Sequence, residues 1–260
     1  YLNRALSSAF TPGSVFKLVT AAAALENIPD IEERVFHCDG KLAVGADAVT
    51  CPSKHGDIGF EDALAHSCNV AFAQLALELG GDTLAKYAAD YGLTQRLPIG
   101  NVLTAAGKFE VGADGSIDLA WSGAGQYNDL ASPIAMARLC AAIANGGVAP
   151  ELTATAKSGL FGNAKTQRVM AAETADALRE MMGYNVTSYY GADSFPGLEL
   201  FAKSGTAEVG SSREPHAWFV GFIENGARPL AFAVVVENGG SGRLAAGGVA
   251  NKVLQAAVKK

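Results

Sequence analysis

Three β-rich runs near the end of the chain constrain its fold more than any other feature. They are LELFA, HAWFVGFIE and LAFAVVVEN, which begin at Leu198, His216 and Leu230. Runs of this length, separated by turn-rich segments, predict an antiparallel meander of three strands. The segments before them have helical spacing instead, and helices followed by a block of strands predict an α+β protein.

Helical spacing is clear in the segments that precede the strands. A Pro-Gly pair comes before a predicted helix over residues 14–26, and a second helical region over residues 60–91 is interrupted near Ser67. The chain between about residues 57 and 150 is therefore expected to form an all-helical lobe. A last helix, over about residues 248–259, is expected to cover the sheet together with the first one.

Composition and charge exclude some classes of partner. The chain has 260 residues and a net charge of −6. It offers no basic face that could neutralise phosphates, so nucleic acid is not an expected partner. No apolar run reaches the roughly 18 residues of a membrane span, and the N-terminal residues lack the layout of a signal peptide.

Four cysteines are spread along the chain: Cys38, Cys51, Cys68 and Cys140. Three histidines also lack metal-like spacing: His55, His66 and His216. Without paired CxxC motifs, no metal site is expected. Cys38 and Cys51 flank a Gly-rich segment that is predicted to be a hairpin. The redox compartment of the protein decides between a Cys38–Cys51 disulfide and two reduced thiols, and the sequence favours neither state.

The segment TPGSVFK places a serine and a lysine three positions apart at the start of the first predicted helix. Residues three apart are neighbours on a helix, so the Lys17 amine can reach the Ser14 hydroxyl. A lysine that accepts a proton must be neutral, which requires burial or a second cation nearby. Alone, such a pair is more typical of a capping serine beside a solvated lysine.

The interruption near residue 67 contains a second candidate, HSCNVAF. Ser67 and Asn69 lie in the break between two helical segments, where a hydroxyl and a carboxamide can face a cleft together. Taken alone, an ordinary helix cap is the commoner explanation of this pattern.

A third candidate, KSGTAE, follows the first β-rich run directly. A lysine, a serine hydroxyl and a glycine that lets a ligand approach the backbone can form a ledge for a carboxylate. The KSG triplet occurs twice, at Lys157 and at Lys203. The first copy has no strong strand before it and is predicted to be a loop, so the copy at Lys203 is the candidate.

Together, SxxK, SxN and KSG occur in the order that is typical of penicillin-recognising serine acyltransferases. The chain resembles the transpeptidase domain of class B penicillin-binding proteins in NRALSSAFTPGSVFK, HGDIGFEDALAHSCN, GAGQYNDLASPIAMARLCAAIANGG and KSGTAE. The resemblance spans nearly the whole chain. It implies a β-lactamase/transpeptidase-like fold, with about three C-terminal strands here where the family usually has five.

The resemblance implies three catalytic residues. Ser14 would be the nucleophile, and Lys17 the base that accepts its proton. Ser67 would relay a proton to the leaving amine. The backbone N–H groups of Ser14 and Thr206 would form the oxyanion hole.

The resemblance also implies a set of substrate-binding residues: Asn69, Lys203, Ser204, Gly205 and Thr206. Asn69 would bind the peptide bond of the substrate, while Lys203 and Ser204 would bind its terminal carboxylate. Lys203 would also be the cation that helps to keep Lys17 neutral.

A peptidoglycan D,D-transpeptidase is the implied function. It would crosslink stem peptides through a serine acyl-enzyme, β-lactams would inhibit it covalently, and no metal or organic cofactor would be needed. Its implied place is the outer face of the bacterial cell membrane, in a cell-wall synthesis complex. Residues 1–260 would be one transpeptidase domain that lacks upstream strands, a pedestal domain and a membrane anchor.

Two alternatives stay open, a serine β-lactamase and a β-lactam sensor domain. A class A β-lactamase would need a glutamate in an ExxLN-like setting, which Glu173, Glu180 and Glu199 lack. Lys17 alone does not exclude a class D β-lactamase. A sensor usually follows a membrane-spanning transducer, which this sequence does not show.

Four aromatic residues complete the expectations. Tyr127 follows Gln126 where relatives often have glycine, which is expected to reshape a loop near the cleft. Tyr189 and Tyr190 can either line the cleft or serve packing, and packing is the favoured prediction. Trp218 is predicted to lie in the core.

Overall fold

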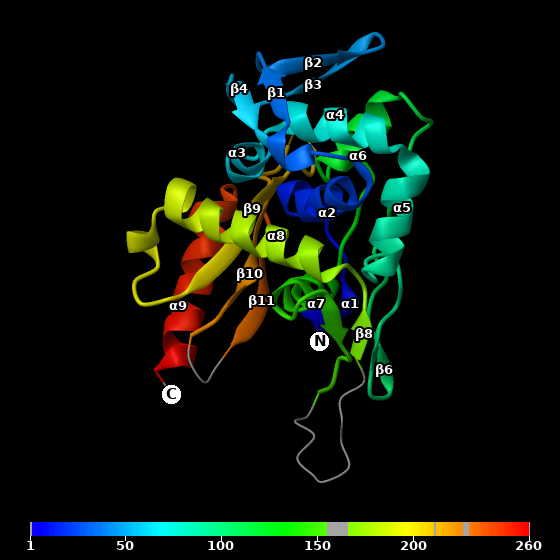
Figure 1. Cartoon of the computed structure of the whole chain (residues 1–260). Helices are drawn as coiled ribbons and strands as arrows, with labels where there is room; N and C mark the ends of the chain where they lie inside the picture. The colour runs from blue at the N-terminus through cyan, green and yellow to red at the C-terminus, as the bar shows by residue number, and fades with distance from the viewer. Residues whose placement is uncertain (1, 155–165, 211, 226–228, 260) are drawn as a thin grey trace.

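The structure is a computed structural model that describes residues 2–154, 166–210, 212–225 and 229–259. Helices and strands alternate irregularly before a C-terminal block of strands and a last helix (Figure 1). The helices are α1 (Arg4–Ser7), α2 (Lys17–Asn27), α3 (Phe60–Ala65), α4 (Asn69–Leu79), α5 (Gly81–Asp90), α6 (Ile117–Gly123), α7 (Pro133–Ala144), α8 (Ala172–Tyr184) and α9 (Gly247–Val258). The strands are β1 (Val35–Cys38), β2 (Lys41–Val44), β3 (Asp47–Thr50), β4 (Gly56–Gly59), β5 (Pro98–Ile99), β6 (Val102–Leu103), β7 (Val148–Pro150), β8 (Thr166–Arg168), β9 (Leu200–Ala207), β10 (His216–Ile223) and β11 (Leu230–Val236).

The predicted meander forms the main sheet. Strands β9, β10 and β11 pair antiparallel in the order β11-β10-β9, which confirms three C-terminal strands in the described part of the chain. In this register Trp218 lies opposite Gly205, and Phe219 lies opposite Ser204. The KSG motif therefore belongs to the edge strand β9, next to the central strand β10.

Alternate residues of β10 face two different layers, as the period of a strand requires. Phe219 packs in a cluster with Ala250 and Leu254 of α9, whereas Trp218 and Val220 belong to the larger core on the other face. Figure 1 shows α9 on one side of the sheet and α7 and α8 on the other. The predicted cover by the last helix is thus confirmed. The first helix meets the sheet chiefly through the 3-10 turn at its start.

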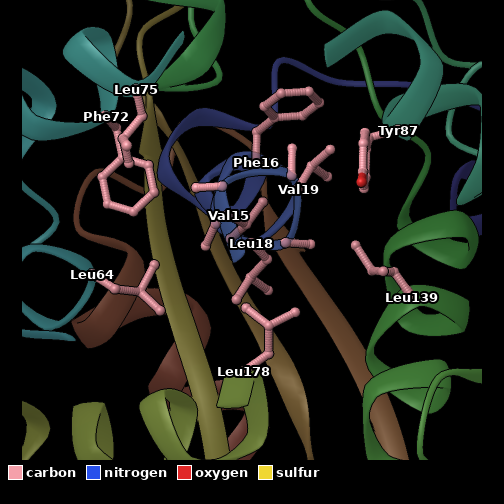
Figure 2. Packing of buried hydrophobic residues seen from close by; sticks show 14 of the residues in the cluster. Val15, Phe16, Leu18, Val19, Leu64, Phe72, Leu75, Tyr87, Leu139 and Leu178 are labelled. Atoms are coloured by element: carbon pink, nitrogen blue, oxygen red, sulfur yellow. The ribbon is translucent and has the colours of Figure 1, made fainter. Parts of the chain in front are cut away.

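Helix α2 is the buried centre of the molecule. Residues 17–24 are all buried, and four of them are consecutive alanines. A helix that is covered on every side needs small residues, because neighbouring elements approach it closely from several directions. Figure 2 shows side chains from other elements, among them Phe72 and Leu178, around Val15, Leu18 and their neighbours. The alanine-rich sequence after TPGSVFK therefore reflects burial on all sides.

The break predicted near Ser67 is present between α3 and α4. Ser67 has a φ of 56°, in the left-handed region that non-glycine residues seldom adopt. The Gly-rich segment before it forms the β2–β3 hairpin, as predicted. Among the described residues, no helix is both long and apolar enough for a transmembrane segment.

Candidate active site

The turn that carries Ser14 packs closely against β9. Residues Gly13–Phe16 form a 3-10 turn, and the α-helix begins at Lys17. Gly13 has a φ of 55°, and a Cβ placed there would lie 2.6 Å from the Thr206 carbonyl oxygen. Its N–H donates to the Gly125 carbonyl at 2.8 Å. Only glycine fits this contact, and the contact brings the backbone at Ser14 beside that of Thr206.

The Lys17 amine lies at the centre of the site and is fully buried. Its Nζ is 3.2 Å from the Ser14 Oγ, which confirms that the side chains three residues apart meet. The same nitrogen is 2.7 Å from Asn69 Oδ1 and 2.6 Å from the Ser67 carbonyl oxygen. The strained turn at Ser67 thus supplies a backbone acceptor for the amine.

The Ser67 hydroxyl bridges two amines. Its Oγ is 3.2 Å from Lys17 Nζ and 3.0 Å from Lys203 Nζ. Lys203 is also fully buried, and its amine donates to the Ser204 carbonyl oxygen at 2.9 Å. The three sequence motifs, which lie far apart in the chain, therefore meet at one hydroxyl group.

Burial shifts the pKa of both amines downward. Desolvation lowers the pKa of Lys17 from its ordinary value to about 7, because the charged form loses its hydration. The pKa of Lys203 also lies well below its ordinary value, first through burial and second through the nearby charge of Lys17. Like charges that share one hydroxyl oppose each other, so the two amines do not both carry a proton readily near neutral pH.

A cleft of about 950 Å³ opens over this pair of amines. Five of the predicted site residues line it: Ser14, Ser67, Asn69, Ser204 and Thr206. Lys17 and Lys203 do not line the cleft themselves; they are buried and contact Ser67, which does. At Gly205 a Cβ would lie 3.0 Å from a Val15 methyl group, so this glycine lets β9 pack closely on the turn that carries Ser14. The KSG copy at Lys157 lies outside the described residues.

Asn69 lines the cleft and also makes hydrogen bonds within the protein. Its oxygen accepts a hydrogen bond from Lys17, and its Nδ2 donates to the Thr50 carbonyl at 2.9 Å. Both ends of the carboxamide therefore have protein partners. In this arrangement Asn69 orients the Lys17 amine.

Sequence reasoning missed the part that Tyr190 plays in the site. Its hydroxyl accepts a hydrogen bond from the Ser204 N–H at 2.8 Å and donates to the Ser204 Oγ at 3.1 Å. Tyr190 is buried, as predicted, but it also fixes the serine of KSG. Tyr189 is 47% exposed and lines the cleft, so the less favoured of its two predicted roles is the one the structure shows. Two adjacent tyrosines carry no signal that separates these roles.

Two more cleft residues were given no role of their own by the sequence. The Gln126 side chain donates to the Thr206 carbonyl at 3.2 Å, and Arg243 lines the cleft while donating to the Tyr190 carbonyl. Tyr127 adopts a φ of 74°, which is a conformation that suits the glycine expected in relatives. Trp218 is fully buried, as predicted, and its indole N–H donates to the Thr11 carbonyl at 2.9 Å.

Three cysteines and one histidine from separate segments of the chain lie close together in the structure. Donor atoms of Cys38, Cys51, His55 and Cys68 all lie within 4.8 Å of one another. The expectation that no metal site exists rested on the absence of CxxC spacing, and that argument does not apply to donors from separate segments. The four cysteines are free, so the Cys38–Cys51 disulfide is not formed in this structure.

The protein has an α+β fold, and its cleft places a serine beside two buried lysines. This combination defines the class of penicillin-recognising serine proteins. The family model for the penicillin-binding protein transpeptidase domain matches residues 1–259. The chain is 31% identical over 282 residues to the peptidoglycan D,D-transpeptidase PbpA of Mycobacterium tuberculosis (strain CDC 1551 / Oshkosh), an alignment that covers 99% of this chain and 57% of PbpA.

Solved structures agree with this relationship. Penicillin-binding protein A from M. tuberculosis, as an imipenem acyl-enzyme complex, has a TM-score of 0.86 and 27% identity, over 99% of this chain and 62% of that one. A chain from a peptidoglycan synthase complex has a TM-score of 0.83 and 26% identity, over 97% and 47% of the two chains. The present chain belongs to the penicillin-binding protein transpeptidase family. It spans only about half to three fifths of the length of these relatives.

Proposed function

We propose that this chain is a D,D-transpeptidase domain that crosslinks peptidoglycan stem peptides through an acyl-enzyme on Ser14. The observation that carries the proposal is the buried Lys17 amine, 3.2 Å from the Ser14 hydroxyl and with a pKa lowered to about 7. A neutral amine at this distance can accept the proton of the serine. The relationship to the D,D-transpeptidase PbpA supports the same reaction.

In the proposed acylation the Ser14 oxygen attacks the carbonyl carbon of the penultimate D-alanine, and its proton passes to Lys17. The backbone N–H groups of Ser14 and Thr206 would hold the oxyanion. The close packing of Gly13 on Thr206 supports this role, because it sets the two backbones side by side. Collapse of the intermediate would break the amide bond, and the leaving D-alanine amine would take a proton through the Ser67 hydroxyl.

Two buried amines around one hydroxyl suit this proton transfer. The surroundings of Lys17 offer more oxygen acceptors than those of Lys203, which favours the charged form of Lys17 over that of Lys203 when the pair holds one proton. A substrate carboxylate beside Lys203 would favour the charged form of that amine instead. Substrate binding would then leave Lys17 neutral at the moment when it has to act as a base.

The remaining assignments follow from the family. Lys203, Ser204 and the Thr206 hydroxyl would bind the terminal carboxylate, and Gly205 would let the substrate approach the backbone. Asn69 would bind the peptide bond of the substrate. An amine of a neighbouring stem peptide would attack the acyl-enzyme and return the proton to Ser14. β-Lactams would acylate the same serine.

We propose that residues 1–260 act as one transpeptidase domain, outside the cell membrane and in a cell-wall synthesis complex. Residues 57–150 would be its mainly helical lobe, although this range also contains the short strands β5, β6 and β7 and is not all-helical as expected.

A serine β-lactamase is the competing function. Hydrolysis would require a group that activates water against the acyl-enzyme. In the described part of the chain, the hydrogen-bond partners of Lys17 and Lys203 are hydroxyl, amide and carbonyl oxygens, and none is a carboxylate. This environment favours a long-lived acyl-enzyme.

The proposal is tested by intact-protein mass spectrometry after mixing with benzylpenicillin. We expect an adduct with the full mass of the antibiotic that persists for hours, and peptide mapping should place it on the peptide that contains Ser14. Clearance of the adduct within seconds would identify a β-lactamase. Absence of any adduct from the folded protein would contradict both functions.

The pH dependence of acylation gives an independent check on Lys17. The base acts in its neutral form, and its pKa is about 7, so the acylation rate should rise with pH up to about 7 and then level off. Stopped-flow acylation by a chromogenic cephalosporin across this range measures the profile. A rate that kept rising toward the ordinary pKa of a lysine would show that burial does not tune this amine.

A further inference from the structure

A cluster of three cysteines and a histidine lies directly behind the SxN turn. Cys38 ends β1, Cys51 follows β3, His55 lies in the loop before β4, and Cys68 stands between Ser67 and Asn69. Their donor atoms lie within 4.8 Å of one another. The proposed transpeptidase reaction uses none of these four side chains.

The distances within the cluster fit one tetrahedral ion. Zn–S bonds of about 2.3 Å and Zn–N bonds of about 2.0 Å place two sulfur ligands about 3.8 Å apart, and a sulfur and a nitrogen about 3.5 Å apart. In the structure Cys51 Sγ lies 4.0 Å from Cys68 Sγ and 3.6 Å from His55 Nδ1. The set is also chemically selective, because three thiolates and one imidazole are ligands that zinc prefers.

Backbone N–H groups next to the cluster donate hydrogen bonds to two of its sulfur atoms. The Asn69 N–H donates to Cys51 Sγ at 3.3 Å, and the Ala71 N–H donates to Cys68 Sγ at 3.5 Å. Such outer hydrogen bonds orient metal-bound thiolates and stabilise their negative charge. Cys38 and Cys68 are fully buried, so they lie in a place where unpaired thiolates would be costly without a cation.

We propose that Cys38, Cys51, His55 and Cys68 bind one structural Zn²⁺ ion that fixes the SxN turn beside the nucleophile. Four protein ligands fill a tetrahedral shell, so the ion has no open position for substrate or water. Each cysteine that binds as a thiolate releases its proton to solvent, and no oxidation or reduction takes place. The site lies outside the acyl-transfer chemistry and goes beyond the proposed function.

The ion would act on catalysis through position alone. Cys68 lies between the relay hydroxyl of Ser67 and the carboxamide of Asn69, and both of these residues contact Lys17. Cys51 follows Thr50, whose carbonyl accepts a hydrogen bond from Asn69. One ion would therefore tie the β-hairpin segment to the helix break and would hold Ser67 in its left-handed conformation.

A disulfide is the competing state of the same residues. Any bond between two of Cys38, Cys51 and Cys68 would remove two of the four zinc ligands. An oxidising compartment favours that bond, whereas a bound ion protects the thiolates. The two states differ in metal content and in thiol count, and both can be measured on one sample.

The test is metal analysis of the folded chain after reduction and reconstitution with Zn²⁺, with excess ion removed. We expect one zinc per chain. Replacement with Co²⁺ should give the visible bands of a tetrahedral site and a sulfur-to-cobalt charge-transfer band. Cys51→Ser and His55→Gln should lose the stoichiometric ion, while the matched controls Cys140→Ser and His66→Gln should keep it.

Removal of the ion from the unaltered chain tests its positioning role where a variant fails to fold. A strong chelator should slow benzylpenicillin acylation, and added Zn²⁺ should restore the rate. The proposal is overturned if the reduced, folded chain binds no zinc, if Cys51→Ser and His55→Gln bind as much as the controls, or if zinc removal leaves acylation unchanged. Metal content is measured without an antibiotic, so its failure is distinct from failure of the transpeptidase proposal.

Discussion

Replacing Ser14 with alanine should abolish the benzylpenicillin adduct completely. The Ser14 oxygen would form the ester bond itself, whereas the Ser67 hydroxyl, which also lies 3.2 Å from Lys17 Nζ, would relay a proton and would not attack. Loss of the hydroxyl removes one hydrogen bond in a partly exposed turn, and we expect the protein to remain folded. Intact-protein mass spectrometry after overnight incubation measures the result.

The matched control for this variant is Ser7→Ala, which removes an exposed hydroxyl at the end of α1. It should form the adduct at the rate of the unaltered chain. Thermal unfolding of both variants separates a lost nucleophile from a lost fold. A full-mass adduct on folded Ser14→Ala would show that a different residue is the nucleophile.

Replacing Lys17 with methionine should slow acylation by about 10²- to 10⁴-fold, the usual contribution of a positioned general base. Methionine has a similar length and fills the buried space, so the change removes the amine while largely keeping the packing. It leaves Asn69 Oδ1 and the Ser67 carbonyl without their donor, which is expected to reduce stability moderately. The second-order rate constant for acylation is the measurement.

Lys86→Met is the control for the lysine variant, because Lys86 is an exposed residue of α5 whose ion pair with Asp90 lies on the surface. It should acylate normally. If folded Lys17→Met also acylates at the normal rate, another group accepts the proton of Ser14, and the role proposed for Lys17 is wrong.

Local patterns in the sequence singled out the chemistry-bearing residues as candidates, and the resemblance of the three ordered motifs to a known family gave them their roles. Ser14 and Lys17 are neighbours by helical spacing, and Ser67 lies where apolar periodicity breaks. Lys203 continues an alternating run of residues and lies within β9. Local rules of this kind work because the chain fixes these side chains within a single element.

Features that depend on distant contacts could not be predicted in this way. Cys38, Cys51, His55 and Cys68 come from four separate segments, so no spacing rule relates them. Tyr190 holds Ser204 only because the irregular helical turn after α8 packs beside β9. The central place of α2 likewise depends on the elements that surround it.

The burial of α2 limits which substitutions this chain can accept. A side chain larger than alanine at positions 21–24 would have to push neighbouring elements apart, since these positions have no free surface. The amide groups of this helix should exchange with deuterium only when the whole domain unfolds. Selection for altered antibiotic recognition can therefore act on the rim of the cleft, at exposed residues such as Tyr189 and Arg243, while the helix that carries the base stays fixed.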